Sequence, residues 1–279
     1  MITKNIGGFK MLLNPKDRGI SSHLAKKGSR EECFMWVLAR EATGDLGLDV
    51  GANIGYTTLH LCKAMKKVIA IEPDPRSLKL LKKNIKLNNY SGSTEIHSFA
   101  ISDVNGTATI CLANKPNLST LSIKARKEGA KIVGKNETIK TKTIDSLGVL
   151  PNFIKMDIEG FEVEALRGAM ESLRKTPNCK ILIEVHPQFY DGDSFETVLK
   201  QLSGIGFRAK YIVSAGVPQP DLFKKNGYEP MPGAPINRRA VYNCISQEHA
   251  IKWASHSIKQ VCRNGKVSPK IVRSILLVK

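Results

Sequence analysis

A short apolar run leads into a glycine turn at Leu48-Asp49-Val50-Gly51-Ala52-Asn53-Ile54-Gly55. About twenty residues later, a second apolar run ends in an acidic residue at Val68-Ile69-Ala70-Ile71-Glu72-Pro73. A buried strand followed by a Gly-x-x-x-Gly turn and a helix leaves backbone N–H groups open at the start of the helix. An acidic residue that ends the next strand can accept hydrogen bonds from both hydroxyls of a ribose. The pattern therefore predicts a cofactor that contains a nucleoside.

The turn favours S-adenosylmethionine over a nicotinamide dinucleotide. Dinucleotide-binding turns usually read Gly-x-Gly-x-x-Gly, and their second glycine lets the backbone approach a pyrophosphate. Asn53 occupies that place in this chain. S-adenosylmethionine carries an amino-acid end instead of a pyrophosphate, which suits a turn with Asp49 and Asn53. Two alternatives stay open, a nicotinamide oxidoreductase and a turn in which Gly51 and Gly55 have no ligand.

Strand-like and helix-like segments alternate from residue 47 to about residue 246. Predicted strands end near Val50, Ile71, Met156 and Val185, and predicted helices separate them. The helix after Glu72 begins at an N-capping aspartate followed by proline, a combination typical of helix starts. This alternation predicts an α/β protein whose mainly parallel sheet is covered by helices on both faces.

The chain divides into a core and two basic flanking segments. We expect a lead-in of a hairpin and a helix over residues 1–46, a cofactor-binding domain over 47–249, and a basic helical tail over 250–279. Residues 113–137 are polar and lysine-rich with little periodicity, and we interpret them as a mobile insertion that could lie over the site.

Composition limits the class of protein. The content of hydrophobic residues, 42%, allows a full core, and the six cysteines form no C-x-x-C pair, which argues against a disulfide framework or a zinc knuckle. No apolar stretch approaches the roughly 20 residues needed to span a bilayer. We therefore expect a soluble, cytoplasmic protein.

The net charge of +18 is concentrated at the periphery of the predicted core. Residues 1–30, 115–142 and 250–279 hold 22 of the 43 Lys and Arg residues but only three of the 25 Asp and Glu residues. Segregated positive charge favours an acidic partner, such as RNA, an anionic membrane surface that binds the protein peripherally, or a phosphorylated substrate. A lysine-rich surface that merely aids solubility explains the charge equally well.

Ionisable residues gather at the ends of two later strands. Lys155-Met156-Asp157-Ile158-Glu159-Gly160-Phe161-Glu162 ends one strand and opens a helix, where Glu159 and Glu162 could simply complement the helix dipole. Asp157 directly follows an apolar strand, where an unpaired carboxylate would be costly unless it met a ligand, a metal or Lys155.

Glu184 and His186 lie two residues apart and so share one face of an extended strand. If that strand neighbours the one before Asp157, the three side chains can meet. They would form either a divalent-metal site or a histidine base oriented by carboxylates. The simpler alternative is that His186 ends the strand and pairs with Glu184. We take Lys155, Asp157, Glu184 and His186 as the candidate catalytic residues, and the last three as candidate metal ligands.

These residues give the chain a specific resemblance. It is similar to the FkbM-type methyltransferases, a branch of the Rossmann-like S-adenosylmethionine-dependent enzymes, over roughly residues 5–246. The resemblance rests on four motifs, which are Leu48 to Gly55, Ile71-Glu72-Pro73-Asp74-Pro75, Lys155 to Glu162, and Ile183-Glu184-Val185-His186.

The resemblance implies a class I methyltransferase fold with a seven-stranded, mostly parallel sheet and S-adenosylmethionine as donor. It further implies O-methylation of a sugar, glycolipid, polyketide or similar small acceptor. Glu72 would bind the ribose, Asp157 would flank the methyl group, and Lys155, Glu184 and His186 stay candidates for catalysis. The remaining predicted cofactor contacts are Asp49, Gly51, Ala52, Asn53 and Gly55 at the methionine end, Pro73 beside the ribose, and Phe99, Ala100 and Asp103 near the adenine.

Two other functions remain open at this stage. An RNA methyltransferase would explain the positive charge, although aromatic residues make up only 6% of the chain and no aromatic-rich basic strand offers a surface for base stacking. A non-catalytic protein that binds S-adenosylmethionine would retain the fold without the activity. The sequence identifies neither the acceptor nor the oligomeric state.

Overall fold

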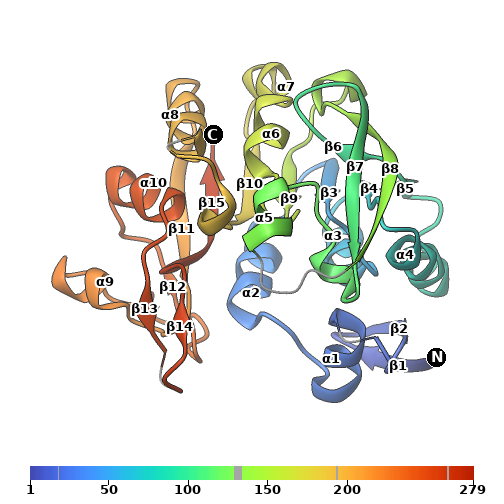
Figure 1. The fold of residues 1–279 in the computed structure, drawn as a ribbon, viewed down its shortest axis with the longest axis horizontal. Helices are drawn as coiled ribbons and strands as arrows, with labels where there is room; N and C mark the ends of the chain where they lie inside the picture. The colour runs from blue at the N-terminus through green and yellow to red at the C-terminus, as the bar shows by residue number, and fades with distance from the viewer. Residues whose placement is uncertain (18, 129–133, 193, 263) are drawn as a thin grey trace.

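The computed structural model describes residues 1–17, 19–128, 134–192, 194–262 and 264–279 (Figure 1). Its centre is a mixed eight-stranded sheet in which five neighbouring strands run parallel and the last three pair antiparallel. In spatial order the strands are β5 (Thr94–His97), β4 (Lys67–Ile71), β3 (Leu46–Val50), β9 (Phe153–Met156), β10 (Lys180–Glu184), β15 (Val272–Val278), β11 (Arg208–Ser214) and β12 (Val241–Tyr242).

Helices cover both faces of this sheet, which explains why the central strands are apolar along nearly their whole length. On one face, apolar residues of four helices pack into a common core with the hairpin strands β1 (Ile2–Ile6) and β2 (Phe9–Leu13). These helices are α1 (Ile20–Lys27), α2 (Glu32–Glu41), α3 (Tyr56–Ala64) and α4 (Pro75–Leu87). The helices in the core of the other face are α6 (Glu162–Arg167), α7 (Met170–Lys175), α8 (Ser194–Gly204) and α10 (Gln247–Ser255).

The fold class predicted from the sequence is confirmed. The sheet is mostly parallel and covered on both faces, as the Rossmann-like class I methyltransferase fold requires. It has eight strands instead of seven, because the two-residue strand β12 adds an outer edge beside β11. The predicted helix after Glu72 begins as expected, since Asp74 caps α4 by accepting a hydrogen bond from the backbone N–H of Arg76.

The predicted basic helical tail is wrong. Helix α10 ends at Ser255, and the chain then forms the small hairpin of β13 (Gln260–Val261) and β14 (Val267–Ser268) before it enters the sheet as β15. Strand β15 lies between β10 and β11 and is largely buried. Its sequence, VRSILLV, is apolar on both faces and rich in residues that favour strands, so a position inside a sheet suits it better than an exposed helix.

The lead-in and the insertion are more structured than predicted. The lead-in has the expected hairpin, but two helices follow it instead of one. In the predicted insertion 113–137, residues 129–133 lie outside the described residues. The remainder contains the 3-10 turn η1 (Pro116–Leu118), α5 (Ile123–Glu128) and the start of β8 (Gly134–Lys142). Strand β8 lies between β6 (Ala100–Ile101) and β7 (Gly106–Ala113) in a separate three-stranded sheet.

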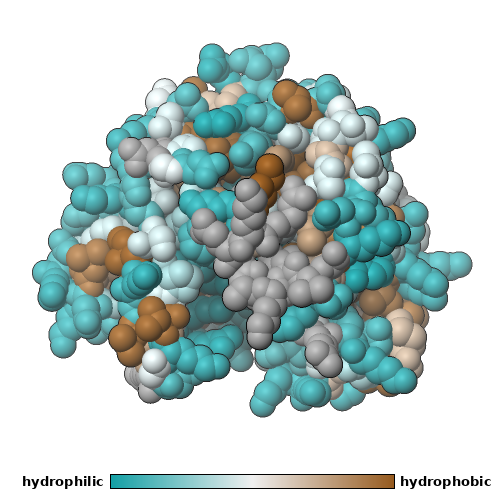
Figure 2. Space-filling model, in the orientation of Figure 1, coloured by the Kyte–Doolittle hydropathy of each residue, from teal (hydrophilic) through white to brown (hydrophobic). Residues whose placement is uncertain are grey.

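Three short helical elements complete the described structure, η2 (Asp145–Leu147), η3 (Pro187–Phe189) and α9 (Asp221–Lys225). Within the described part of the chain, no helix is both long enough and apolar enough to cross a membrane. On the face drawn in Figure 2, hydrophilic side chains predominate and apolar ones form small separate patches.

Candidate functional site

The glycine turn after β3 is held against the neighbouring strands by close backbone contacts. The backbone N–H groups of Gly51 and Ala52 both donate to the carbonyl oxygen of Ile71, at 3.0 Å each. Gly51 has φ +80°, and a Cβ at this position would lie 2.0 Å from the carbonyl oxygen of Asp157. Only glycine fits there, because both the backbone angle and the close approach exclude a side chain.

Asp49 is fully buried and supports the turn from within the protein. Its carboxylate accepts hydrogen bonds from the hydroxyls of Thr57 and Thr58, at 2.9 and 2.7 Å, and Lys155 Nζ lies 3.0 Å from its Oδ1. Lys155 Nζ also donates to the carbonyl oxygen of Gly51, at 2.6 Å. Asp49 is therefore occupied by protein groups, and this geometry does not support its predicted direct contact with a cofactor. The structural partners of Lys155 are Asp49 and the carbonyl oxygen of Gly51.

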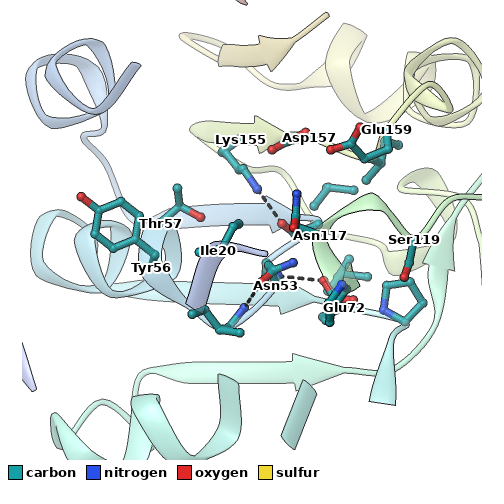
Figure 3. Close-up of a pocket in the computed structure, with 18 of the residues that line it drawn as sticks. Ile20, Asn53, Tyr56, Thr57, Glu72, Asn117, Ser119, Lys155, Asp157 and Glu159 are labelled. Carbon is teal, nitrogen blue, oxygen red and sulfur yellow. Dashed lines mark hydrogen bonds between the residues drawn. The ribbon is translucent and has the colours of Figure 1, made fainter. Parts of the chain in front are cut away.

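Glu72 faces the glycine turn across the site. One carboxylate oxygen accepts a hydrogen bond from the backbone N–H of Asn53 at 2.7 Å (Figure 3). The other accepts from the backbone N–H of Asp74 at 2.8 Å. Burial raises the pKa of Glu72 to about 7, although these two hydrogen bonds oppose the shift. Glu72 is thus fixed at the end of β4, in a position where a ligand hydroxyl can reach its carboxylate.

A cavity of about 1010 Å³, including its open mouth, connects this turn with the end of β9. Eight of the predicted site residues line the cavity, Gly51, Ala52, Asn53, Glu72, Pro73, Ala100, Lys155 and Asp157. Six predicted residues do not line it, Asp49, Gly55, Phe99, Asp103, Glu184 and His186.

Three of these six have clear structural roles. Gly55, with φ +90°, stands at the N-cap of α3 and packs against Leu81. Phe99 stacks on His97 at 4.9 Å between ring centroids. Asp103 accepts a hydrogen bond from the hydroxyl of Ser102, at 3.0 Å. The predicted adenine contacts of Phe99 and Asp103 are therefore not supported by this geometry.

The insertion and the lead-in supply the other walls of the cavity. Asn117 and Ser119 of the insertion, together with Ile20 and Phe34 of the lead-in helices, lie along it. In Figure 3 the side chain of Asn117 projects between Glu72 and Lys155. Sequence reasoning predicted that the insertion could cover the site but singled out none of these residues.

Hydrogen bonds tie the insertion to both ends of the cavity. Ser119 Oγ donates at 2.8 Å to Oδ2 of Asp74, two residues after Glu72. Thr120 Oγ1 donates to the carbonyl oxygen of Glu159 at 2.8 Å. Arg76 pairs with Asp74 at 2.6 Å and also donates to the carbonyl oxygen of Ala113 at 2.8 Å. These contacts fix the described part of the insertion beside the cavity.

His186 lies among carboxylates at the other end of the cavity. Its Nδ1 is 3.0 Å from Glu162 Oε1, and its Nε2 is 3.2 Å from Glu184 Oε1 and 3.4 Å from Glu159 Oε2. Burial and the nearby Lys270 lower the pKa of His186, but Glu162 and Glu159 outweigh them and raise it to about 10. His186 is consequently a cation at neutral pH, and Glu162 is one of its principal partners instead of only a first-turn acid.

Two cations from the C-terminal region enter the same cluster. Arg273 Nη2 lies 2.6 Å from Glu184 Oε1 and 2.5 Å from Glu31 Oε1. Lys270 Nζ lies 3.9 Å from Glu184 and donates to the carbonyl oxygen of Val185. Burial raises the pKa of Glu184, but Arg273 outweighs it and holds that pKa well below the usual range.

Three acids of this cluster line the cavity, Glu31, Asp157 and Glu159, and the last two follow β9. Burial raises the pKa values of these last two, to about 6 for Asp157 and about 7 for Glu159. Asp157 Oδ1 is buried and has no hydrogen-bond partner among the described residues. An unpartnered buried oxygen that borders a cavity is a natural contact for a ligand.

The donor atoms of Asp157, Glu159 and His186 lie within 4.8 Å of one another. This set differs from the predicted metal ligands because Glu184 is held by Arg273 and is replaced in the set by Glu159. Both ring nitrogens of His186 already face carboxylates, and Lys270 and Arg273 balance much of the negative charge. These two cations therefore offset part of the negative charge that a metal ion would otherwise compensate.

Sequence reasoning missed Glu31, Lys270 and Arg273. Their only signals were one of two adjacent acids in the lead-in, Glu31 and Glu32, and two cations in an otherwise apolar segment, and neither pattern indicates a site. They reach the cluster because β15 is inserted next to β10 and because α2 begins beside it.

Comparison with known proteins identifies relatives of this chain. The family model described as the methyltransferase FkbM domain matches residues 49–209, more than half of the chain. The hexuronic acid methyltransferase AglP of Haloferax volcanii is 29% identical over 169 residues, which cover 56% of this chain and 62% of AglP. Methyltransferase 1 of Beauveria bassiana is 27% identical over 142 residues, covering 43% of this chain and 57% of that protein. The chain thus spans about three fifths of the length of these curated relatives.

Solved structures show a weaker similarity. The methyltransferase FkbM from Methylobacillus flagellatus aligns with a TM-score of 0.44 and 16% identity over 85% of this chain and 44% of that one. An S-adenosylmethionine-dependent O-methyltransferase from Thermotoga maritima aligns with a TM-score of 0.42 and 13% identity over 92% and 69%. The fold assignment rests on the strand order described above.

Proposed function

From the chain's membership of the FkbM methyltransferase family, we propose that it transfers the methyl group of S-adenosylmethionine to a hydroxyl oxygen of a sugar or similar small hydroxylated acceptor. The family implies the donor. A sugar acceptor draws support from AglP, whose name describes a hexuronic acid methyltransferase.

The main support for the proposal is one continuous cavity that joins the glycine turn and Glu72 to Asp157. Bound at the turn, S-adenosylmethionine supplies a methyl group already activated by its positively charged sulfur. Glu72 would accept the ribose hydroxyls, and the backbone of Gly51, Ala52 and Asn53 would line the methionine end. The protein then needs mainly to align donor and acceptor, which can lower the barrier by roughly 7 to 11 kcal/mol.

Asp157 is the residue we assign as base for the acceptor hydroxyl. Its Oδ1 lacks a partner, whereas both ring nitrogens of His186 are engaged by carboxylates. The proton of the hydroxyl would pass to Asp157 Oδ1 as the oxygen bonds to the methyl carbon and the bond from that carbon to sulfur breaks. In this scheme Glu184 and His186 position the neighbouring acids, and Lys155 holds the turn through Asp49 and Gly51.

The first test is calorimetric titration of the protein with S-adenosylmethionine and, in parallel, with NAD. We expect micromolar binding of S-adenosylmethionine, weaker binding by Glu72→Ala, and no binding of NAD. Transfer of a radiolabelled methyl group to hexosides and hexuronosides then tests the acceptor class. Binding of NAD in place of S-adenosylmethionine would overturn the proposal, and donor binding without transfer to any hydroxylated acceptor would favour a binding protein.

A divalent metal ion is the alternative to Asp157 for removing the proton of the acceptor hydroxyl, because such an ion acidifies a bound hydroxyl. The charge balance among Arg273, Lys270 and the acids favours the route without a metal. We therefore expect methyl transfer to persist after treatment with EDTA. Loss of transfer with EDTA and its recovery with Mg²⁺ or Mn²⁺ would instead support a metal at Asp157, Glu159 and His186. Binding of RNA or an anionic membrane by the basic segments stays a prediction from the sequence.

A further inference from the structure

Three guanidinium groups converge on one carboxylate oxygen beside the cavity. Oε1 of Glu31 lies 2.5 Å from Arg273 Nη2, 3.4 Å from Arg30 Nη2 and 3.7 Å from Arg239 Nη1. Arg30 and Glu31 both line the cavity. The three arginines come from the segment before α2, the segment before β12 and strand β15, so the cluster forms only in the folded protein.

The three arginines are not equally satisfied. Arg273 also contacts Glu184 at 2.6 Å and thus has two close carboxylate partners. The side chains of Arg30 and Arg239 make no hydrogen bond to a described residue, although each guanidinium has five N–H donors. Their exposed fractions are only 26% and 13%, so water replaces the missing partners incompletely.

Three arginines meet two carboxylates in this place, those of Glu31 and Glu184. Burial and Arg273 lower the pKa of Arg239 to about 10, even though Glu31 and Glu184 act in the opposite direction. Arg30 and Arg239 are partly buried, and a partly desolvated guanidinium with few partners gains charge-assisted hydrogen bonds from a bound anion.

The cluster adjoins the reacting end of the cavity. Arg273 links it to Glu184, whose Oε1 lies 3.2 Å from His186 Nε2. Arg239 lies outside the lining of the cavity, in the segment that packs on α2 through a contact of Cys33 Sγ with the carbonyl oxygen of Pro235. A ligand that touches both Arg30 and Arg239 must therefore extend from the cavity toward the protein surface.

We propose that Arg30 and Arg239 bind an anionic group of the methyl acceptor, a carboxylate or a phosphate attached to a sugar. This inference rests on the proposed function and narrows its acceptor class. The planar guanidinium matches both anions through paired hydrogen bonds. In the free protein, water and the shared carboxylate of Glu31 contact these arginines. The anion of the acceptor would replace those contacts. The bound anion would then orient a ring hydroxyl toward Asp157.

Three probes with the same ring hydroxyls at C2 to C4 test this inference. They are methyl β-D-glucuronoside, methyl β-D-glucoside 6-phosphate and the neutral methyl β-D-glucoside. Binding of each is measured by calorimetry on protein saturated with S-adenosylhomocysteine, and methyl transfer is measured separately. We expect at least one anionic probe to bind about tenfold to hundredfold more tightly than the neutral one. The tighter of the two anionic probes identifies the anion.

Arg239→Gln and Arg30→Gln should remove this preference and leave the Kd for S-adenosylmethionine unchanged. Arg239→Lys, which keeps the charge but loses the paired donors, should retain part of it. Lys82→Gln, which removes an exposed cation from α4, is the matched control and should change neither value. Thermal melting of each variant separates loss of binding from loss of folding.

Equal or undetectable binding of the charged and neutral probes would overturn the inference. Variants that weaken donor binding instead would overturn it as well, because the arginines would then hold the donor's own carboxylate. If methyl groups are transferred without a preference for an anionic probe, the proposed function holds and this inference is wrong. If an anionic probe is preferred through Arg239 but no probe is methylated, the anion site holds and the proposed function is wrong.

Discussion

The two ends of the cavity are built in different ways. At the donor end, residues 51–53 face Glu72, and the contacts are mainly backbone N–H groups that donate to a carbonyl or a carboxylate. At the reacting end, side chains from α2, the ends of β9 and β10, and β15 share one network of charges. The donor end thus depends on backbone geometry, whereas the reacting end depends on a balance of charges brought from distant parts of the chain.

This difference predicts where substitutions are tolerated. Backbone contacts survive most changes of side chain, except at Gly51, where any side chain meets the backbone of Asp157. Buried charges are interdependent, because removal of one partner leaves the other without compensation. We therefore expect larger effects from single substitutions at the reacting end.

The largest effect is expected for Asp157→Asn, which keeps the shape of the side chain but removes the base. A general base contributes about 10² to 10⁴ in rate, so kcat should fall within that range. The Kd for S-adenosylmethionine should stay within about twofold of the original value, because the donor end is unchanged. Glu171→Gln, at an exposed acid of α7, is the control. If Asp157→Asn also weakens donor binding, the donor end of the cavity does not act independently of the reacting end.

Arg273→Met tests the charge balance directly. The substitution removes the cation shared by Glu31 and Glu184, and loss of one partner of a buried ion pair costs about 3 to 5 kcal/mol of unfolding free energy. Chemical denaturation followed by circular dichroism measures this value. The exposed Lys82→Met should change it by less than about 0.5 kcal/mol. A similarly small effect at Arg273 would contradict the view that the network stabilises the fold.

A smaller, pH-dependent effect is expected at the donor end. The pKa of Glu72 is about 7 in the folded protein. In the proposed function, ribose hydroxyls bind its ionised form. Donor affinity should therefore rise as pH increases through 7 and then level off, and Glu72→Gln should abolish that dependence. For the free protein the sign is opposite. A raised carboxyl pKa favours the folded state at low pH, and we expect up to about 3 kcal/mol of that stability to be lost between the unfolded value of 4.5 and 7.

Calorimetry from pH 5.5 to 8.5 measures the donor affinity, and denaturation over the same range measures the stability. If the donor affinity of the original protein does not change with pH, or if Glu72→Gln keeps the same pH dependence, Glu72 does not bind the donor.

The smallest effect is expected for Ser119→Ala, which removes one hydrogen bond between the insertion and the donor end of the cavity. The hydroxyl donates to Asp74 and accepts from the backbone N–H of Ala113, and the net contribution of such hydrogen bonds is about 1 kcal/mol. Donor affinity should fall a few-fold, as measured by calorimetry. Ser91→Ala, at an exposed turn, should have no effect. An unchanged affinity in Ser119→Ala would mean that the insertion does not help to hold the donor.

The donor end was the more predictable from the sequence. The glycine turn, Glu72 and the cap of α4 depend on residues close together in the chain, and short-range geometry leaves few alternatives. Asp49 was the exception, because the same acid can either face a ligand or support the turn, and only the positions of Thr57, Thr58 and Lys155 distinguish these roles. The C-terminal region was mispredicted because periodicity alone does not distinguish a short apolar helix from a buried strand, although the residue types of β15 favour the strand.

The sequence by itself determined the class of fold and the two motifs of the donor end. These features follow from local backbone preferences and from the rule that ligands gather where parallel strands end at the same edge of a sheet. The tertiary structure showed that β9 and β10 are neighbours, the condition on which the predicted approach of Asp157 and His186 depended. Only the tertiary structure decided that His186 is a cation among acids, that Arg273 and Lys270 offset part of their charge, and that Arg30 and Arg239 meet at Glu31 beside the cavity. The energies of buried charges depend on distances between groups far apart in the chain, and those distances exist only after the sheet has formed.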